Sequence, residues 1–480
     1  GGLARIATLV KAVRAETDAL ILVDAGERLF QEADLVEVMA DQWRTKADFV
    51  QKAYGALGVA VVNLGADDLA AGSALALEGS RGIGAVPISA NLFEKEANRK
   101  TLTQAATILE AGGVRVAFLG IADPASLGEE AAGLLRAEEP LNRVRVTVAE
   151  LQAEADVVIL LSTLPLASNR ALAAKVAGLD LVIGAVGSGE GENVVVPERA
   201  GNSLVVQVKP LGEFVGRIDL TLPPRGAKSE EGFQDVTPED PIWGMPPEGG
   251  APGGGISFGD DLDLRGAPAR ESARSVPPVP PPAPGTIRHT VYAIGSPLVE
   301  DAGIQRLMNE YKLKVAEMNR NAPVTAERIP TDGPAYAGAE ACKSCHAPVH
   351  EFVGTLAHAR AYATLEKRNS QFDLECVGCH VTGWDKPGGF NHPAAVGNLK
   401  DVQCEACHGP GSVHIASGGA RGVGNMHAEV PRETCLGCHT PEHSTRFAPE
   451  EKVYLERIRC SQAILTGLTD SAAKPPSTPE

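Results

Sequence analysis

The chain has 480 residues, a mean hydropathy of −0.05 and a formal charge of −17 at pH 7, which suits two or three domains that each bury a core. Its acidic residues are spread along the chain, so a nucleic-acid partner is not expected and a cationic partner is favoured. No run of about 18 apolar residues occurs, so we expect no transmembrane segment, and membrane association only through a lipid or a partner.

The first 222 residues predict a layered α/β domain. They begin with an amphipathic helix, GGLARIATLVKAVRAE, which has neither an initiator Met nor a signal region, so we expect a segment to precede Gly1. Helical stretches then alternate with short runs rich in Val, Ile and Leu, which indicate a sheet covered on both faces. The runs are ALILVDA, GVAVVNL, AVPISAN, RVAFLGI, DVVILLS, LDLVIGA and SLVVQVK.

Residues 223–286 hold 14 of the 34 prolines and few large apolar side chains, which predicts an extended linker or wrapping arm. An alternative is an insertion whose isolated PIWG and ISF segments dock onto a neighbour. Residues 287–335 follow with a predicted strand, TIRHTVYAI, and a long amphipathic helix that complete or bridge from the first domain. A cysteine- and histidine-rich region, 336–480, comes last.

Four C-x-x-C-H motifs carry the chemistry of this last region. They are CKSCH (342–346), CVGCH (376–380), CEACH (404–408) and CLGCH (435–439). Two thiols at this spacing can form thioethers to one haem while the adjacent His binds its iron. Zinc sites or disulfides do not require a His after every second Cys, and a thioredoxin-like pair requires one motif beside a βαβ unit. The sequence thus predicts four covalently bound haem c groups.

Each residue type in the motifs has an expected role. The proximal iron ligands are His346, His380, His408 and His439. The covalent attachment sites are Cys342, Cys345, Cys376, Cys379, Cys404, Cys407, Cys435 and Cys438. The ninth cysteine, Cys460, lies outside any pair and is expected to be a buried or free thiol.

Roughly residues 336–458 resemble the cytochrome c554 family of tetrahaem electron carriers. The resemblance rests on the order of the haem motifs, on HARAY after the first, on GGF after the second, and on CHGPG with a following His at the third. It implies a small, mostly helical and loop multihaem domain in which His358 and His414 are distal iron ligands. Further distal candidates are His427, His443 and His350, followed by His392 and His289. The family can also leave the haem of the second motif five-coordinate.

Residues 1–222 resemble the 5'-nucleotidase branch of the metallophosphoesterases, through the DAGE turn and the segments DVVILLSTLPL and AGLDLVIGAVGSG. This resemblance implies an αββα sandwich with a two-metal centre. The metal-binding positions differ, however, because Glu27, Thr163, Val186 and Ser188 stand where the family has Asp and His, and no His precedes His289. We therefore expect the fold without the hydrolase chemistry. Asp24, Glu27, Asp67 and Asp68 are expected on a solvated rim, with a cation such as Ca²⁺ as the alternative.

The sequence as a whole predicts an extracytoplasmic tetrahaem cytochrome that relays electrons, in a bacterial periplasm or at the cell surface, within a respiratory or other electron-transfer complex. The phosphatase-like domain would serve docking or assembly with redox protein partners. Ligation by two His predicts low reduction potentials. Two alternatives involve catalysis, namely a haem enzyme that reduces a small nitrogen oxide at a five-coordinate haem, and a phosphohydrolase regulated by the haem module. The pattern favours electron transfer over an enzyme.

Overall fold

The computed structural model describes residues 2–96, 100–185, 194–207, 214–223, 232–238, 242–243, 276, 278–294, 298–322, 333–384, 386–392, 398–420, 422–424, 426–440, 444 and 447–460. These fall into two compact units that divide after Tyr311, inside helix α7 (Ala302–Asn321). The division into residues 1–222, 223–286, 287–335 and 336–480 that the sequence analysis expects stays a prediction.

The N-terminal unit is built on a six-stranded sheet in the order β10–β11–β9–β8–β6–β5. The pairs β11–β9, β9–β8 and β8–β6 are parallel, and each edge strand runs antiparallel to its neighbour. All six residues of β8 are buried, as expected for a strand covered on both faces. The strands are β5 (Ala106–Ala111), β6 (Val114–Ile121), β8 (Val157–Ser162), β9 (Leu181–Gly184), β10 (Val194–Ala200) and β11 (Ser203–Gln207).

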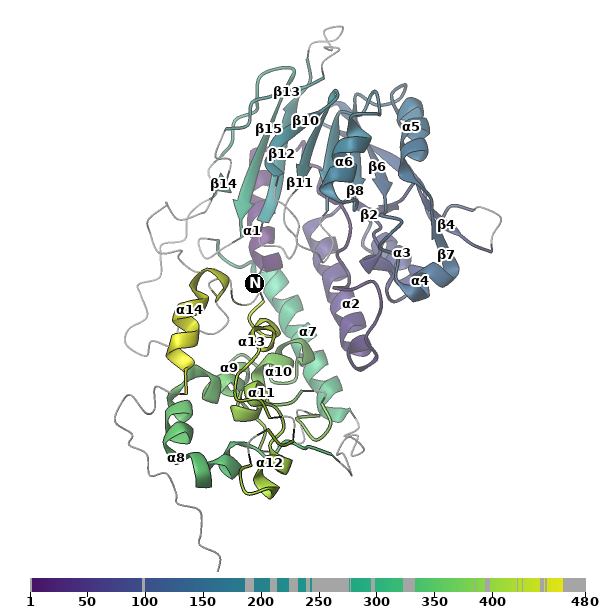
Figure 1. Ribbon diagram of the computed structural model, residues 1–480. Helices are drawn as coiled ribbons and strands as arrows, with labels where there is room; N and C mark the ends of the chain where they lie inside the picture. The colour runs from purple at the N-terminus through teal and green to yellow at the C-terminus, as the bar shows by residue number, and fades with distance from the viewer. Residues whose placement is uncertain are drawn as a thin grey trace, which may run out of the picture. The chain divides into compact units, whose positions relative to one another are not determined.

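Side chains of this sheet alternate between two cores. Leu119 and Leu160 pack against α5 (Pro140–Leu151) and α6 (Leu166–Ala173), whereas Phe118 and Ile159 face a second layer of strands. That layer contains the parallel sheet β1 (Val23–Asp24), β2 (Val61–Asn63) and β3 (Val86–Ile88), together with β15 (Thr286–Ala293). Helix α1 (Gly2–Glu16) packs on the outer side of β15. The predicted αββα layering is confirmed (Figure 1).

Strand β15 pairs along its whole length with β12 (Phe214–Thr221). The short strands β13 (Gln234–Asp235) and β14 (Ile242–Trp243) add to it in parallel. Ile242 and Trp243 of the PIWG segment thus dock on β15, as the insertion alternative expects, while Pro241, Gly244 and the ISF segment lie outside the described residues.

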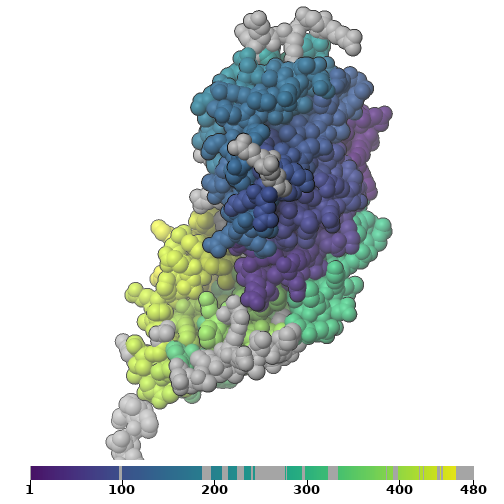
Figure 2. Space-filling view, turned by 90° about the vertical axis from the view of Figure 1, so that its right-hand side faces the viewer, coloured from purple at the N-terminus to yellow at the C-terminus, as the bar shows by residue number. Residues whose placement is uncertain are grey.

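The remaining elements of this unit cover the sheets, and its residues up to about 200 form the closely packed purple and blue body in Figure 2. They are η1 (Glu37–Met39), α2 (Ala40–Leu57), η2 (Asp67–Leu69), α3 (Ser73–Gly82), β4 (Leu92–Glu94), α4 (Glu129–Leu134) and β7 (Leu135–Ala137).

The C-terminal unit is made of short helices and loops, as the sequence predicts. Its described part also holds a small apolar core of Tyr362, Leu365, Val377, Val381, Phe390 and Leu399. Among the helices that the structure describes, none has the length and hydropathy to cross a bilayer. The helices are α8 (Ala339–Thr355), η4 (Ala357–Arg360), α9 (Ala361–Lys367), α10 (Leu374–His380), α11 (Cys404–His408), α12 (Ser412–Ala416), α13 (Arg432–Leu436) and α14 (Phe447–Ile458).

Candidate metal centre

Each C-x-x-C-H motif lies on a helical turn. The first three are in α8, α10 and α11, and the fourth begins in α13 (Figure 1). In the fourth motif the turn continues past the helix, because the amides of Cys438 and His439 donate to the carbonyl of Cys435 at 3.1 and 2.8 Å. A helical turn places residues i, i+3 and i+4 on one face, so both thiols and the imidazole of a motif point the same way.

The thiols of different motifs lie beside one another. Cys342 of the first motif donates a hydrogen bond to Cys404 of the third, which lowers the pKa of Cys404 to about 7. In the same way, Cys438 of the fourth motif donates to Cys379 of the second and lowers the pKa of Cys379 to about 7.

The third and fourth motifs are close enough for their thiols to influence each other electrostatically. Burial raises the pKa of Cys407, in the third motif, to about 11, and the neighbouring Cys435 of the fourth motif adds to this rise. The motifs therefore neighbour one another in the order first, third, fourth, second. Cys460 belongs to the same group, since it lies near Cys404 and Cys407.

Four imidazoles are oriented through their Nδ1 atoms. His380 Nδ1 lies 2.7 Å from the carbonyl oxygen of Ala361, and His408 Nδ1 lies 2.7 Å from the carbonyl oxygen of His427. His414 Nδ1 lies 3.0 Å from the carbonyl oxygen of Ala420. His439 Nδ1 lies 2.9 Å from the hydroxyl oxygen of Ser444. Because a carbonyl oxygen only accepts, the proton of His380, His408 and His414 stands on Nδ1, and the lone pair of Nε2 is left for a metal. This arrangement is typical of metal-binding histidines, so the residues present fit haem iron.

The rings of His358 and His439 lie at a separation that suits two ligands of one metal ion. Their ring centres are 6.1 Å apart with an interplanar angle of 72°. A metal–imidazole bond is about 2 Å long, so two imidazoles on opposite sides of one ion have ring centres roughly 6 Å apart. Phe447 stacks on His439 at 4.4 Å, which fixes this ring further.

The other histidine candidates are placed differently. His350 Nε2 lies 3.3 Å from Glu340 Oε1, and His427 holds His408 through its main chain, with the amide of His427 donating to the His408 carbonyl at 2.8 Å. His392 is buried in the C-terminal unit, and His289 is buried in strand β15 of the N-terminal unit. His443 lies outside the described residues, and His346 lies in α8 at a kink, with a non-helical backbone at φ −121° and ψ 38°.

A buried carboxylate that the sequence analysis missed connects the first and third motifs. Glu405, inside the third motif, is 1% exposed and accepts from the amides of Ala337, Gly338 and Gly411 at 2.6–3.1 Å. Gln403 adds a bond from the amide of Ala339 at 2.6 Å. A charged residue between two motif cysteines is the one sequence signal that pointed to this role.

In the N-terminal unit, the residues that stand at the metal-ligand positions of the metallophosphoesterases also lie close together. Glu27 and the loop after β2 meet at the carboxyl ends of the parallel strands, and a Cβ on Gly26 would lie 2.7 Å from Thr163. Burial, with the carboxylates of Asp68 and Asp67, raises the pKa of Glu27 to about 8. The predicted solvated rim is wrong for Asp67 and Asp68, which are 8% and 0% exposed, while Val186 and Ser188 lie outside the described residues.

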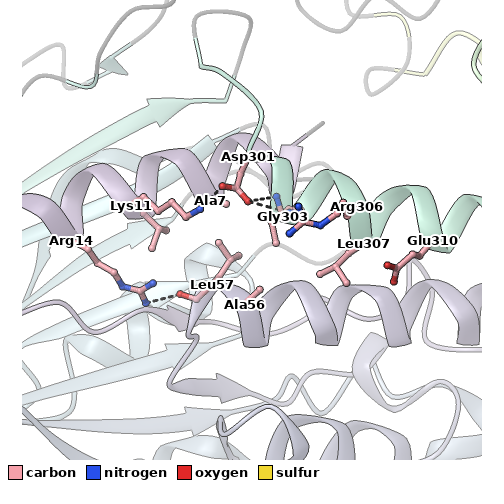
Figure 3. Close-up of a pocket in the computed structure, with 12 residues that line it drawn as sticks. Ala7, Lys11, Arg14, Ala56, Leu57, Asp301, Gly303, Arg306, Leu307 and Glu310 are labelled. Atoms are coloured by element: carbon pink, nitrogen blue, oxygen red, sulfur yellow. Dashed lines mark hydrogen bonds and ion pairs between the residues drawn. The ribbon is translucent and has the colours of Figure 1, made fainter.

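A hollow of about 360 Å³ lies elsewhere in the same unit, between α1, the end of α2 and the start of α7 (Figure 3). Lys11 and Asp301 form an ion pair across it, and Arg14 donates to the carbonyl of Leu57 at 2.6 Å. None of the predicted site residues lines this hollow.

Comparison with known proteins identifies the C-terminal chemistry. Residues 341–409, which include the first three motifs, match the family of cytochrome c554 and c-prime. Cytochrome c-554 of Nitrosomonas europaea is 31% identical over 102 residues, which cover 18% of this chain and 43% of that protein. The chain thus spans less than half the length of this relative. The matched region is a c-type cytochrome module, a class that carries covalently bound haem and transfers electrons.

Solved structures similar to the chain include two from Thermus thermophilus. The sulfate thiohydrolase SoxB, in complex with glycerol, has a TM-score of 0.47 and 15% identity, covering 74% of this chain and 53% of that one. A 5'-nucleotidase precursor has a TM-score of 0.45 and 18% identity, covering 70% and 58%. With both TM-scores below 0.5, these matches carry no conclusion about activity.

Proposed function

We propose that this chain is an extracytoplasmic c-type cytochrome with four covalent haems that relays single electrons between redox protein partners. The N-terminal unit then serves as a docking or assembly surface without hydrolase activity. The observation that carries the proposal is the contact order of the motifs, in which Cys342 neighbours Cys404, Cys407 neighbours Cys435, and Cys438 neighbours Cys379. Groups attached at neighbouring thiols lie close together, as electron transfer between them requires.

The chain's own residues would hold and orient these groups. The two cysteines of each motif form the thioethers, and His346, His380, His408 and His439 bind iron from the side of the helical turn. Haem, when bound, supplies an iron that alternates between two oxidation states. The main-chain carbonyls on His380 and His408 fix the ring orientation and increase the basicity of Nε2, which favours the oxidised iron and a low potential.

Distal ligation is proposed for two further histidines. The separation of 6.1 Å supports His358 as the ligand opposite His439. The bond between His414 Nδ1 and the Ala420 carbonyl supports His414 as a ligand of another iron. Sites with two such ligands leave no open position for a substrate, which supports a relay over a haem enzyme.

The place and partners of the chain are also proposals. Cytochrome c maturation occurs outside the cytoplasmic membrane, which supports a bacterial periplasm or cell surface. The net charge of −17 supports a redox partner with a cationic docking surface, within a respiratory or other electron-transfer complex.

The test removes one attachment site. The full chain is produced in a host that matures c-type cytochromes, with the double substitution Cys435→Ser and Cys438→Ser. We expect four haems in the unsubstituted protein by intact mass, three in the variant, and slower reduction of the haem at the second motif, because its route through the fourth is lost. The control Cys460→Ser should keep all four haems. Fewer than four haems in the unsubstituted protein, or cyanide binding to one of them, would count against the relay.

A further inference from the structure

The N-terminal unit has a buried polar cluster where its resemblance to metallophosphoesterases implies two metal ions. Glu27, Asp68 and Asn63 meet there, at the carboxyl ends of β1 and β2. The side chains present do not fit metal ions, because within the described ranges no group of three or more His, Cys, Asp or Glu residues could hold one. The negative charge of the buried carboxylates must therefore be balanced by something other than a metal ion.

The guanidinium of Arg28 lies in this cluster. Its Nη1 is 3.1 Å from Asp68 Oδ1 and 3.5 Å from the Asn63 carbonyl, and its Nη2 donates to the Ser80 hydroxyl at 2.7 Å. The side chains of Arg28 and Asp68 are 2% and 0% exposed. A cation and a carboxylate buried this deeply persist only when each is paired.

The carboxylate oxygens that would bind a metal are already occupied. Asp68 accepts from the amides of Glu27 and Gly65, both at 3.0 Å, in addition to its bond with Arg28. Glu27 accepts from the amides of Ala66 and Asp67 at 3.2 and 2.7 Å.

Space is short as well. Glu27 reaches the cluster from a left-handed backbone conformation, at φ 62°. A Cβ on Gly65 would lie 2.3 Å from its carboxyl carbon, so the carboxylate packs directly on the loop. The cluster is closed around its own hydrogen bonds.

We propose that Arg28 is an internal cation that takes the place of the metal ions, so that this unit keeps its fold without bound metal. The guanidinium supplies positive charge at the carboxyl ends of the parallel strands, where the buried carboxylate of Asp68 needs it. Because the charge is covalently part of the chain, it creates no hydroxide and no open coordination position. The proposal gives a physical cause for the absence of hydrolase chemistry that the sequence predicts, and it does not depend on the haems.

The experiment measures thermal unfolding of the full haem-loaded chain with EDTA and with MnCl2, beside hydrogen exchange of residues 60–70. The unsubstituted protein should show the same Tm under both conditions. Arg28→Met should lower the Tm of the N-terminal unit by roughly 10 °C and accelerate exchange at Gly65 and Asp67. Arg44→Met, at an exposed pair with Asp41, is the control and should change neither.

A loss of Tm with EDTA, or a gain with Mn²⁺, in the unsubstituted protein would overturn the proposal, and so would an Arg28→Met variant that melts like the Arg44 control. Should the Arg28→Met variant fail to fold, the two measurements on the unsubstituted chain still decide, since they need no substitution. Soret absorbance, followed in the same samples, reports the haem module separately, so a failure there concerns the proposed function alone.

Discussion

Replacement of Glu405 by Ala should destabilise the C-terminal unit strongly, because this carboxylate holds together the chain around two motifs. It accepts from the amides of Ala337 and Gly338, which precede the first motif, and from Gly411, which follows the third. The bonds from Gly338 and Gly411 are buried, at 2.7 and 2.6 Å. The methyl group of Ala reaches none of these donors.

The size of the effect follows from the orphaned amides. An unsatisfied buried donor costs about 1–3 kcal/mol, so the two buried amides give a loss of about 2–6 kcal/mol in the free energy of unfolding. The partly buried amide of Ala337 regains water at smaller cost. Glu405→Gln keeps one carbonyl oxygen and should lose roughly half as much.

Urea unfolding of the haem-loaded protein, followed by Soret absorbance and circular dichroism, measures this loss. Glu351→Ala is the matched control, since Glu351 is exposed on α8, and it should change the free energy by less than about 0.5 kcal/mol. A loss below about 1 kcal/mol in Glu405→Ala would show that the first and third motifs are held together by other contacts.

Three further outcomes are expected. His358→Ala should convert one low-spin iron to a form that binds cyanide, seen by EPR, whereas His350→Ala should not; an unchanged spectrum would remove His358 from the ligands. The Tm of the N-terminal unit should fall by several degrees between pH 4.5 and 8, because the pKa of Glu27 is raised to about 8 in the folded state and the folded protein therefore binds the proton more tightly than the unfolded chain. Glu27→Gln should flatten this dependence, and an equal slope in both proteins would refute it. Ser444→Ala should raise the potential of one haem in a redox titration, because His439 loses its Nδ1 partner at 2.9 Å, and no shift would exclude that role.

Much of the N-terminal fold follows from local pattern. All seven Val/Ile/Leu-rich runs contain a strand, because parallel strands covered on both faces need apolar side chains at nearly every position. Strand lengths were less predictable. The run ALILVDA yields only β1, Val23–Asp24, since these are the residues that pair with β2.

The sequence predicts more of the cysteine and histidine site than of the acidic cluster in the N-terminal unit. The C-x-x-C-H spacing gives the thiols and the adjacent imidazole of each motif, because a single helical turn brings them together. Which motifs become neighbours depends on contacts between distant segments, such as those of Glu405. The acidic residues of the N-terminal unit were misjudged for the same reason, since the pairing of Arg28 with Asp68 crosses 40 residues.

The hydrogen-bond partners of the imidazoles differ in how they respond to mutation. His380, His408 and His414 are bound by main-chain oxygens, which every amino acid possesses. Substitution at Ala361, His427 or Ala420 therefore leaves the acceptor in place, and the orientation of these imidazoles should tolerate sequence drift. At His439 the partner at 2.9 Å is instead the side-chain hydroxyl of Ser444, so a single substitution at Ser444 can change the environment of this imidazole.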